Sequence, residues 1–240
     1  MLDFNPRGFH RLSPSGDPAL AHPISYARPL FGPAPNARSG WGSCAKRAID
    51  IAGALCGLAL LGLMLPIIAW AIRRDSPGPV FFRQSRIGRD GRTFDIVKFR
   101  TLRVADCEPH RCRQVRRGDP RVTRIGAWLR RTSLDEWPQF LNVLRGEMSI
   151  VGPRPHAAGS RAGDRLFEDV ALRYAERHQV KPGMTGLAQV RGLRGETDTE
   201  DKLVRRVEAD LEYIATWSLW LDLRIIWRTL IALPRLPNAH

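Results

Sequence analysis

One feature constrains the fold of this chain more than any other: a run of 22 residues without a charge, from Ile51 to Ile72. About 20 apolar residues are enough for a helix to cross the hydrocarbon core of a bilayer. The alternative is a helix buried in a soluble core, but such a helix rarely stays apolar on every face for six turns. The run therefore predicts a membrane helix.

Two features of the run predict that this helix bends inside the membrane. Basic residues flank it on both sides, at positions 46–47 and 73–74, and basic residues favour the cytoplasmic side. Pro66 interrupts the run, and a proline removes a helix hydrogen bond and kinks the helix. We expect a re-entrant helix over residues 46–76 that breaks at Pro66. A straight span stays open, because the charge rule only biases orientation.

The two ends of the chain are predicted to be tails. Residues 1–45 hold seven of the chain's 18 prolines and show no apolar period, which predicts a disordered tail. This tail lacks the apolar region and the cleavage site of a signal peptide. We expect a second, short tail at residues 233–240.

The four cysteines form no disulfide framework, and Cys56 in the apolar run indicates a reduced, cytosol-facing protein.

The charge of the chain indicates an anionic partner. The formal net charge is +14, and residues 73–131 hold 17 Arg and Lys against six Asp and Glu. A basic segment directly after a membrane helix suits anionic headgroups and phosphates. Nucleic acid is the rival partner, but no zinc finger, basic zipper or RNP motif is found, so we expect none.

The rest of the chain predicts a mixture of a hairpin, a loop and helices. Residues 79–101 are β-prone on both sides of Asp90-Gly91, which predicts a hairpin. Residues 103–120 form a polar loop. Its Cys107, His110 and Cys112 lack a second pair to complete a zinc site, so we expect no zinc. Helices are expected at 120–131, 136–146, 164–178 and 199–231.

The last of these helices carries an aromatic stripe. Trp220, Leu223, Trp227 and Leu230 share one face, and two arginines lie on another. A helix that lies in the headgroup layer shows this pattern. A stripe that faces a protein core shows it equally well. Both interpretations stay open.

The stretch from Leu129 to Pro155 is where chemistry is most strongly indicated. Asp135 and Glu136 are adjacent carboxylates that cannot point the same way from a helix, so one could attack and the other hold a cation. The competing interpretation is a helix cap, with Ser133 or Asp135 as the first residue. In either case the helix dipole would keep both carboxylates ionised.

Two glycine- and proline-rich turns present cations. The turn at 152–155 carries Arg154, and the turn at 181–186 begins with Lys181. Arginine forks match phosphate geometry, so Arg154 is a candidate phosphate ligand.

Six stretches in one order resemble the bacterial sugar transferase family, the monotopic phosphoglycosyl transferases of surface-polysaccharide pathways. They are KRAID (46–50), the apolar run with its proline, and residues 78–101, 119–155, 180–190 and 213–226. The resemblance implies transfer of a sugar-1-phosphate from a UDP-sugar to polyprenyl (undecaprenyl) phosphate, with release of UMP. It also implies an α+β, mainly helical fold: a re-entrant helix followed by a cytosolic domain over 77–232 with a β-hairpin and amphipathic interfacial helices.

The resemblance also implies roles for single residues. Asp135 matches the family's nucleophile, which forms a covalent aspartyl-phosphosugar, and Glu136 matches the ligand of a Mg²⁺ cofactor. Arg130 matches a phosphate contact, and Arg154 and Gln189 match further substrate-side positions.

Two departures from the family pattern concern the membrane helix and the substrate site. The family often has Ser before the membrane proline, where this chain has Leu65, so the break rests on Pro66 alone. After GLAQV the family usually reads N/S-G-R. Here the arginine is displaced by one residue to Arg194, a substrate-binding candidate.

The resemblance places the chain in the bacterial inner membrane with its active site on the cytoplasmic face. The expected partners are a UDP-sugar, polyprenyl phosphate and an anionic bilayer, together with a second copy of the chain or downstream glycosyltransferases. The WSLWLDL ending at 217–223 resembles exopolysaccharide-initiating members and suggests a hexose. The alternatives are a non-catalytic membrane-bound adaptor of the same family and a bitopic protein with a nucleic-acid-binding domain.

Overall fold

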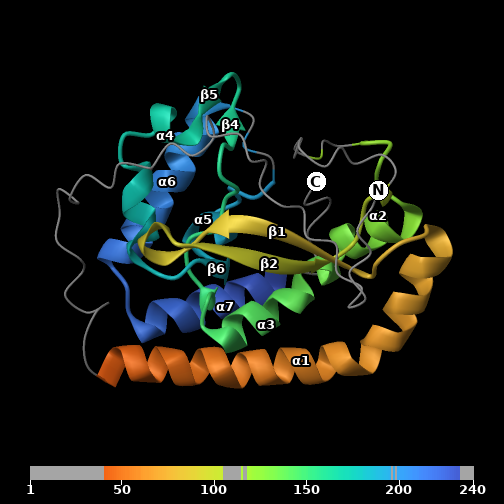
Figure 1. Ribbon diagram of the computed structural model, residues 1–240. Coiled ribbons are helices and arrows are strands. Elements are labelled where there is room, and N and C mark those ends of the chain that lie inside the picture. Colours follow the sequence, from red (N-terminus) through yellow and green to blue (C-terminus); the bar gives the residue numbers. More distant parts are fainter. Residues whose placement is uncertain (1–40, 105–114, 116–117, 196, 198, 233–240) are drawn as a thin grey trace.

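The computed structural model describes residues 41–104, 115, 118–195, 197 and 199–232. Within these residues the chain is mainly helical with three two-stranded sheets. One long helix runs along one side of the molecule, and the hairpin and the shorter helices lie over it (Figure 1). The parts predicted as tails at 1–40 and 233–240, and Cys107, His110 and Cys112, lie outside the described residues.

The long helix α1 (Trp41–Asp75) holds the whole apolar run. It contains Pro66, and Figure 1 shows that it bends in its second half. Leu63 is 77% and Ile67 72% exposed, so much of its apolar surface faces away from the protein. The helix is long and apolar enough to cross or re-enter a membrane. It begins at residue 41, so the predicted end of the tail at residue 45 is wrong.

The first part of α1 packs against the protein through two glycines spaced four residues apart. A Cβ atom on Gly57 would lie 2.4 Å from the ring of Phe140, the first residue of α3 (Phe140–Arg145). A Cβ atom on Gly53 would lie 2.3 Å from Cδ1 of Ile150. Both distances are shorter than real Cβ contacts, so a side chain at either glycine would require Ile150 or Phe140 to move.

A buried ion pair ties the start of α1 to the last helix, α7 (Leu219–Ala232). Lys46 Nζ donates to Asp222 Oδ2 at 2.7 Å, and the Asp222 side chain is 3% exposed. Tyr213 and Trp217 also donate hydrogen bonds to the same carboxylate. Both oxygens of this buried carboxylate therefore have a partner, as burial requires.

Two further polar residues of the KRAID segment attach α1 to the end of α3 and to the strand that follows it. Arg47 donates to the carbonyls of Val143 and Leu144, which lie at the end of α3. Asp50 accepts hydrogen bonds from Ser149 Oγ and from the next backbone N–H, both at 2.9 Å. The segment therefore attaches α1 to the rest of the protein.

The predicted hairpin is confirmed. Strands β1 (Phe81–Ile87) and β2 (Thr93–Phe99) pair antiparallel around the short helix η2 (Arg89–Gly91). Asp90 has φ 53°, as the turn requires of a residue that tolerates the left-handed region. The second part of α1 packs over the hairpin, where Ile72 and Phe99 are 1% exposed.

The shorter elements complete the domain. They are α2 (Arg124–Arg131), η4 (Leu134–Gln139), β3 (Ser149–Val151), β4 (Arg161–Ala162), β5 (Arg165–Leu166), α4 (Phe167–Val170), η5 (Tyr174–Gln179), β6 (Gly183–Thr185), α5 (Leu187–Val190) and α6 (Glu200–Ala215). Strands β3 and β6 pair in parallel. The helices predicted at 120–131 and 136–146 are present, the second as η4 and α3.

The predictions for the last two helices were wrong in detail. A continuous helix over 164–178 is replaced by β5, α4 and η5. The helix expected over 199–231 is split into α6 and α7, because the chain turns at 216–218 and places the Trp217 indole on Asp222.

The aromatic stripe of α7 faces outward. Trp220 is 73%, Trp227 65% and Leu230 56% exposed, whereas Ile225 on the opposite side is 1% exposed. The core-facing interpretation of the stripe is therefore wrong. The exposed apolar face is the one expected of a helix in the headgroup layer.

Candidate active site

The adjacent carboxylates Asp135 and Glu136 lie in the short helix η4, between α2 and α3. Ser133 precedes this helix with φ 57°, and its side chain makes no capping hydrogen bond. Asp135 lies inside the helix rather than at its cap position. The cap interpretation of this segment is therefore wrong, and the left-handed conformation of a non-glycine residue marks local strain of the kind found at functional sites.

Asp135 is a buried carboxylate without a hydrogen-bond partner among the described residues. The residue is 5% exposed. Burial and the adjacent charge of Glu136 raise the pKa of Asp135 to about 6, although Lys98, Arg130 and Arg154 oppose this. The expectation that the helix dipole favours the ionised form is corrected in direction, because the pKa of Asp135 is raised and not lowered. The Asp135 carboxylate is therefore buried and has no hydrogen-bond partner within the described residues.

Glu136 differs from its neighbour in that both of its oxygens are paired. Lys98 Nζ donates to Oε1 at 2.6 Å, and Arg154 donates to both oxygens at 2.5 and 3.1 Å. Although burial acts in the opposite direction, the charges of Arg154 and Lys98 hold the pKa of Glu136 well below its usual range. Glu136 is therefore a permanent anion that orders two cations around Asp135.

Lys98 is a site residue that our reading of the sequence missed. It lies on β2, where the alternation of a strand places Phe94, Ile96 and Lys98 on one face. A lysine in phase with buried apolar residues is the signal that could have found it. Burial lowers the pKa of Lys98, although Glu136 opposes this.

Arg130 and Arg194 reach the same region from two other elements. Arg130, in the last turn of α2, donates from Nε to Thr101 Oγ1 at 2.8 Å, and its charge acts on Asp135. Burial and the charge of Arg154 lower the pKa of Arg194, and Glu136 raises it. The displaced arginine therefore lies within electrostatic reach of Arg154 and Glu136.

A buried network holds the turn that presents Arg154. Arg177 donates to the Arg154 carbonyl at 2.8 Å and pairs with Asp210 at 2.6 Å. It also donates to Nδ1 of His156, so this imidazole is neutral; burial and the Arg177 charge hold the pKa of His156 well below its usual range. Arg177, His156 and Asp210 were not expected from the sequence.

Gln189 lies in α5 and is 6% exposed. Neither its Oε1 nor its Nε2 has a hydrogen-bond partner within the part of the chain that the structure describes. Buried amides are normally paired, so this one is available to a polar group of a ligand. No described contact joins it to Glu136.

Glu136 is an oxygen donor of the kind that the Mg²⁺ implied by the family resemblance prefers, although its oxygens also accept hydrogen bonds from Lys98 and Arg154. Mg²⁺ takes oxygen ligands and commonly binds through one or two carboxylates, phosphate oxygens and water. Asp135 and Glu136 supply two adjacent carboxylates, and no cluster of three or more His, Cys, Asp or Glu exists among the described residues. A Mg²⁺ ion held here would need phosphate and water as its other ligands.

The residues that surround Asp135 belong to segments that a family model also matches. The model of the bacterial sugar transferases matches residues 41–235. The chain belongs to this family. The predicted sugar transferase assignment is therefore confirmed.

Several curated bacterial sugar transferases and related proteins resemble the chain. Undecaprenyl-phosphate glucose phosphotransferase of Komagataeibacter xylinus is 50% identical over 80% of this chain, which spans 36% of that relative. Exopolysaccharide production protein PSS of Rhizobium leguminosarum bv. phaseoli is 49% identical over 78% of the chain and 94% of the relative. UDP-glucose:undecaprenyl-phosphate glucose-1-phosphate transferase of Caulobacter vibrioides is 49% identical over 81% of the chain and 72% of the relative.

Proposed function

We propose that this chain transfers glucose-1-phosphate from UDP-glucose to undecaprenyl phosphate and releases UMP. Family membership supports the reaction, and the names of two relatives at about 50% identity, a glucose phosphotransferase and a glucose-1-phosphate transferase of undecaprenyl phosphate, support the sugar. One observation carries the assignment of the site: Asp135 is a buried, unpaired carboxylate with three cations acting on it.

The proposed reaction has two steps. An Asp135 carboxylate oxygen attacks the phosphorus that bears the sugar, the bond from this phosphorus to the bridging oxygen breaks, and UMP leaves with the electron pair. An oxygen of the lipid phosphate then attacks the same phosphorus, the bond to Asp135 breaks, and the carboxylate is regenerated. The product is a lipid diphosphate sugar. The sequential binding of two phosphate substrates at one site is what a covalent intermediate allows.

The cations around Asp135 have a defined task in this scheme. Arg130, Arg154 and Lys98 would stabilise negative charge on the transferring phosphoryl group, which is the largest contribution that a protein can make to phosphoryl transfer. Mg²⁺ held by Glu136, when bound, would neutralise phosphate charge in the same way. The site would face the cytoplasm, where UDP-sugars are made.

The decisive test is Asp135→Asn in the full-length protein. We expect UMP release from UDP-glucose to fall by several orders of magnitude, because an amide cannot attack phosphorus. Wild-type protein given UDP-glucose without lipid acceptor should gain the mass of one hexose phosphate on the peptide that contains Asp135.

Asp135→Asn tests the loss of activity without a loss of folding stability. Because the pKa of Asp135 is raised in the folded state, the ionised carboxylate opposes folding at neutral pH, and the Asn variant should be at least as stable as wild type. An active Asn variant, together with wild-type protein that forms no adduct, would refute the covalent mechanism. In that case the non-catalytic adaptor would be favoured only if wild type also released no UMP.

A further inference from the structure

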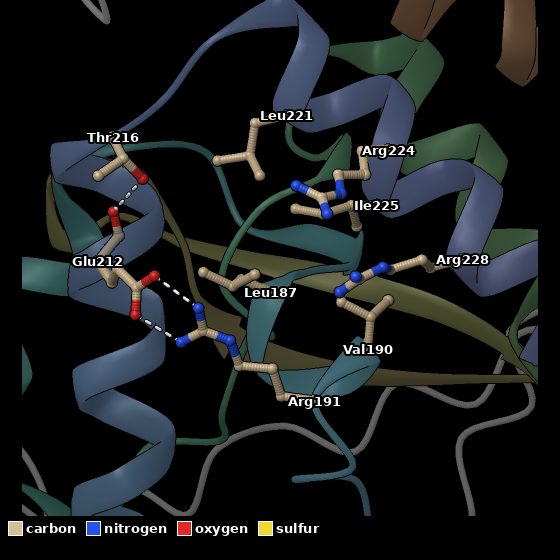
Figure 2. Close-up of a pocket in the computed structure, with 9 residues that line it drawn as sticks. All are labelled: Leu187, Val190, Arg191, Glu212, Thr216, Leu221, Arg224, Ile225 and Arg228. Atoms are coloured by element: carbon tan, nitrogen blue, oxygen red, sulfur yellow. Dashed lines mark hydrogen bonds and ion pairs between the residues drawn. The ribbon is translucent and has the colours of Figure 1, made fainter.

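A pocket of about 280 Å³ opens between α5, α6 and α7 (Figure 2). It is lined by Leu187, Val190, Arg191, Glu212, Thr216, Leu221, Arg224, Ile225 and Arg228. None of these residues is among the charges that shift the pKa of Asp135 or Glu136. No residue of η4, which carries Asp135 and Glu136, lines the pocket, and the proposed reaction gives it no role.

The charge of the pocket favours an anion. Arg224 and Arg228 lie one turn apart on α7, and Figure 2 shows both side chains extending toward α5. Both residues are exposed, and within the described chain neither guanidinium has a hydrogen-bond or ion-pair partner. Arg191 is paired with Glu212, so these two charges cancel. Two uncompensated guanidinium groups remain, and guanidinium forks match phosphate oxygens.

The position of the pocket favours an anion that belongs to a lipid. Leu223 and Trp227 precede the two arginines in the sequence and lie on the outward face of α7, where Trp227 is 65% exposed. A helix with such a face lies in the interface with its apolar side in the acyl region and its arginines at headgroup level. Leu187 and Ile225 give the pocket an apolar floor.

We propose that this pocket binds the headgroup phosphate of an anionic phospholipid of the bilayer. Arg224 and Arg228 hold the phosphate oxygens, and the acyl chains leave over the outward face of α7. The site goes beyond the proposed function, because it serves the orientation of the protein on the membrane and involves neither Asp135 nor Glu136.

The test measures lipid binding to the full-length protein in neutral detergent. Phosphatidylglycerol is titrated against wild type and against the double variant R224Q/R228Q, and retained lipid is counted by native mass spectrometry. The matched control is R161Q/R165Q, which removes two exposed arginines on β4 and β5, far from α1 in Figure 1. We expect an affinity loss of at least about tenfold in R224Q/R228Q and less than twofold in the control. Equal affinities in the two double variants would overturn the proposal.

Two further arms identify the source of the phosphate. Inorganic phosphate should not displace phosphatidylglycerol from wild type; displacement at low millimolar concentration would mean a site for free anions and would overturn the lipid proposal. The KM for polyprenyl phosphate should be the same in R224Q/R228Q as in wild type. A raised KM would assign the pocket to the acceptor instead. The lipid titration does not depend on turnover, so it stays readable even if the protein releases no UMP.

Discussion

At the scale of residues, the two adjacent carboxylates have different surroundings. Glu136 takes the hydrogen bonds of Lys98 and Arg154, and this leaves Asp135 beside the same cations without a partner. If Asp135 is the nucleophile, as we propose, a hydrogen bond to it would have to break before attack, and the pairing of Glu136 with both cations keeps Asp135 available. The sequence could name both carboxylates, but their surroundings depend on residues distant in the chain.

The raised pKa of Asp135 predicts a pH dependence. The first half-reaction needs the carboxylate ionised, so the UMP burst in the absence of acceptor should rise with pH through about 6 and then level off. Stability should change in the opposite sense. The folded-state pKa lies above the usual 3.8, so this residue stabilises the fold at low pH and loses that contribution as pH rises from about 4 to about 6. A burst that is flat between pH 5 and 7 would contradict the shift.

Metal removal tests the role of Glu136. If this carboxylate helps to hold Mg²⁺, excess chelator should abolish UMP release and added Mg²⁺ should restore it, while Glu136→Gln should lose most turnover and remain folded. Circular dichroism and the thermal midpoint provide the folding control. Full activity in excess chelator would remove the metal from the mechanism.

At the scale of elements, those fixed by neighbouring residues were predictable from the sequence, whereas those fixed by contacts between distant residues were not. The hairpin was predictable because Asp90-Gly91 and the alternation of apolar residues act within a few positions. The interruption of the helix predicted over 164–178 was missed, because Tyr174 and Arg177 turn inward to His156 and Asp210, and these partners lie far away in the sequence. The break before α7 was missed for the same reason.

The bend in α1 leads to a prediction about the side of the membrane on which the two ends of the apolar run lie. If the helix re-enters the membrane, native Cys44 before the apolar run and a cysteine in place of Arg74 after it should both be labelled from the cytoplasmic side; both positions are exposed. Each is tested in a background that lacks the other cysteines. Labelling from opposite sides would establish a span. Pro66→Leu should straighten the helix and increase the spanning population.

At the scale of the whole molecule, the site is assembled from four separate parts of the chain. Lys98 comes from the hairpin, Glu136 from η4, Arg154 from the turn after β3, and Arg194 from the segment before α6. The family resemblance named three of these four residues. It did not show that Arg177 and Asp210 hold the Arg154 turn, because no local pattern marks a buried ion pair.

We predict that the ion pair between Lys46 and Asp222 stabilises the folded protein as a whole. Asp222→Asn should lower the free energy of unfolding by about 3 kcal/mol, because Lys46 then loses its charged partner in a half-buried position. Asp201→Asn is the matched control. Its pair with Arg205 is 79% exposed on the aspartate side, so the loss should stay below about 0.5 kcal/mol. Thermal unfolding in the same detergent checks both, and similar midpoints for the two variants would show that α1 is not held there.

The close packing of α1 has a mechanical consequence. Gly53 and Gly57 leave no gap between this helix and the parts above it, and Asp50 is hydrogen-bonded to the strand that leads into the Arg154 turn. A membrane helix normally answers a change in bilayer thickness by tilting. If α1 lies in the bilayer, a tilt of this helix would carry that strand with it and shift the Arg154 guanidinium relative to Asp135. Bilayer thickness would then alter the geometry of the candidate site.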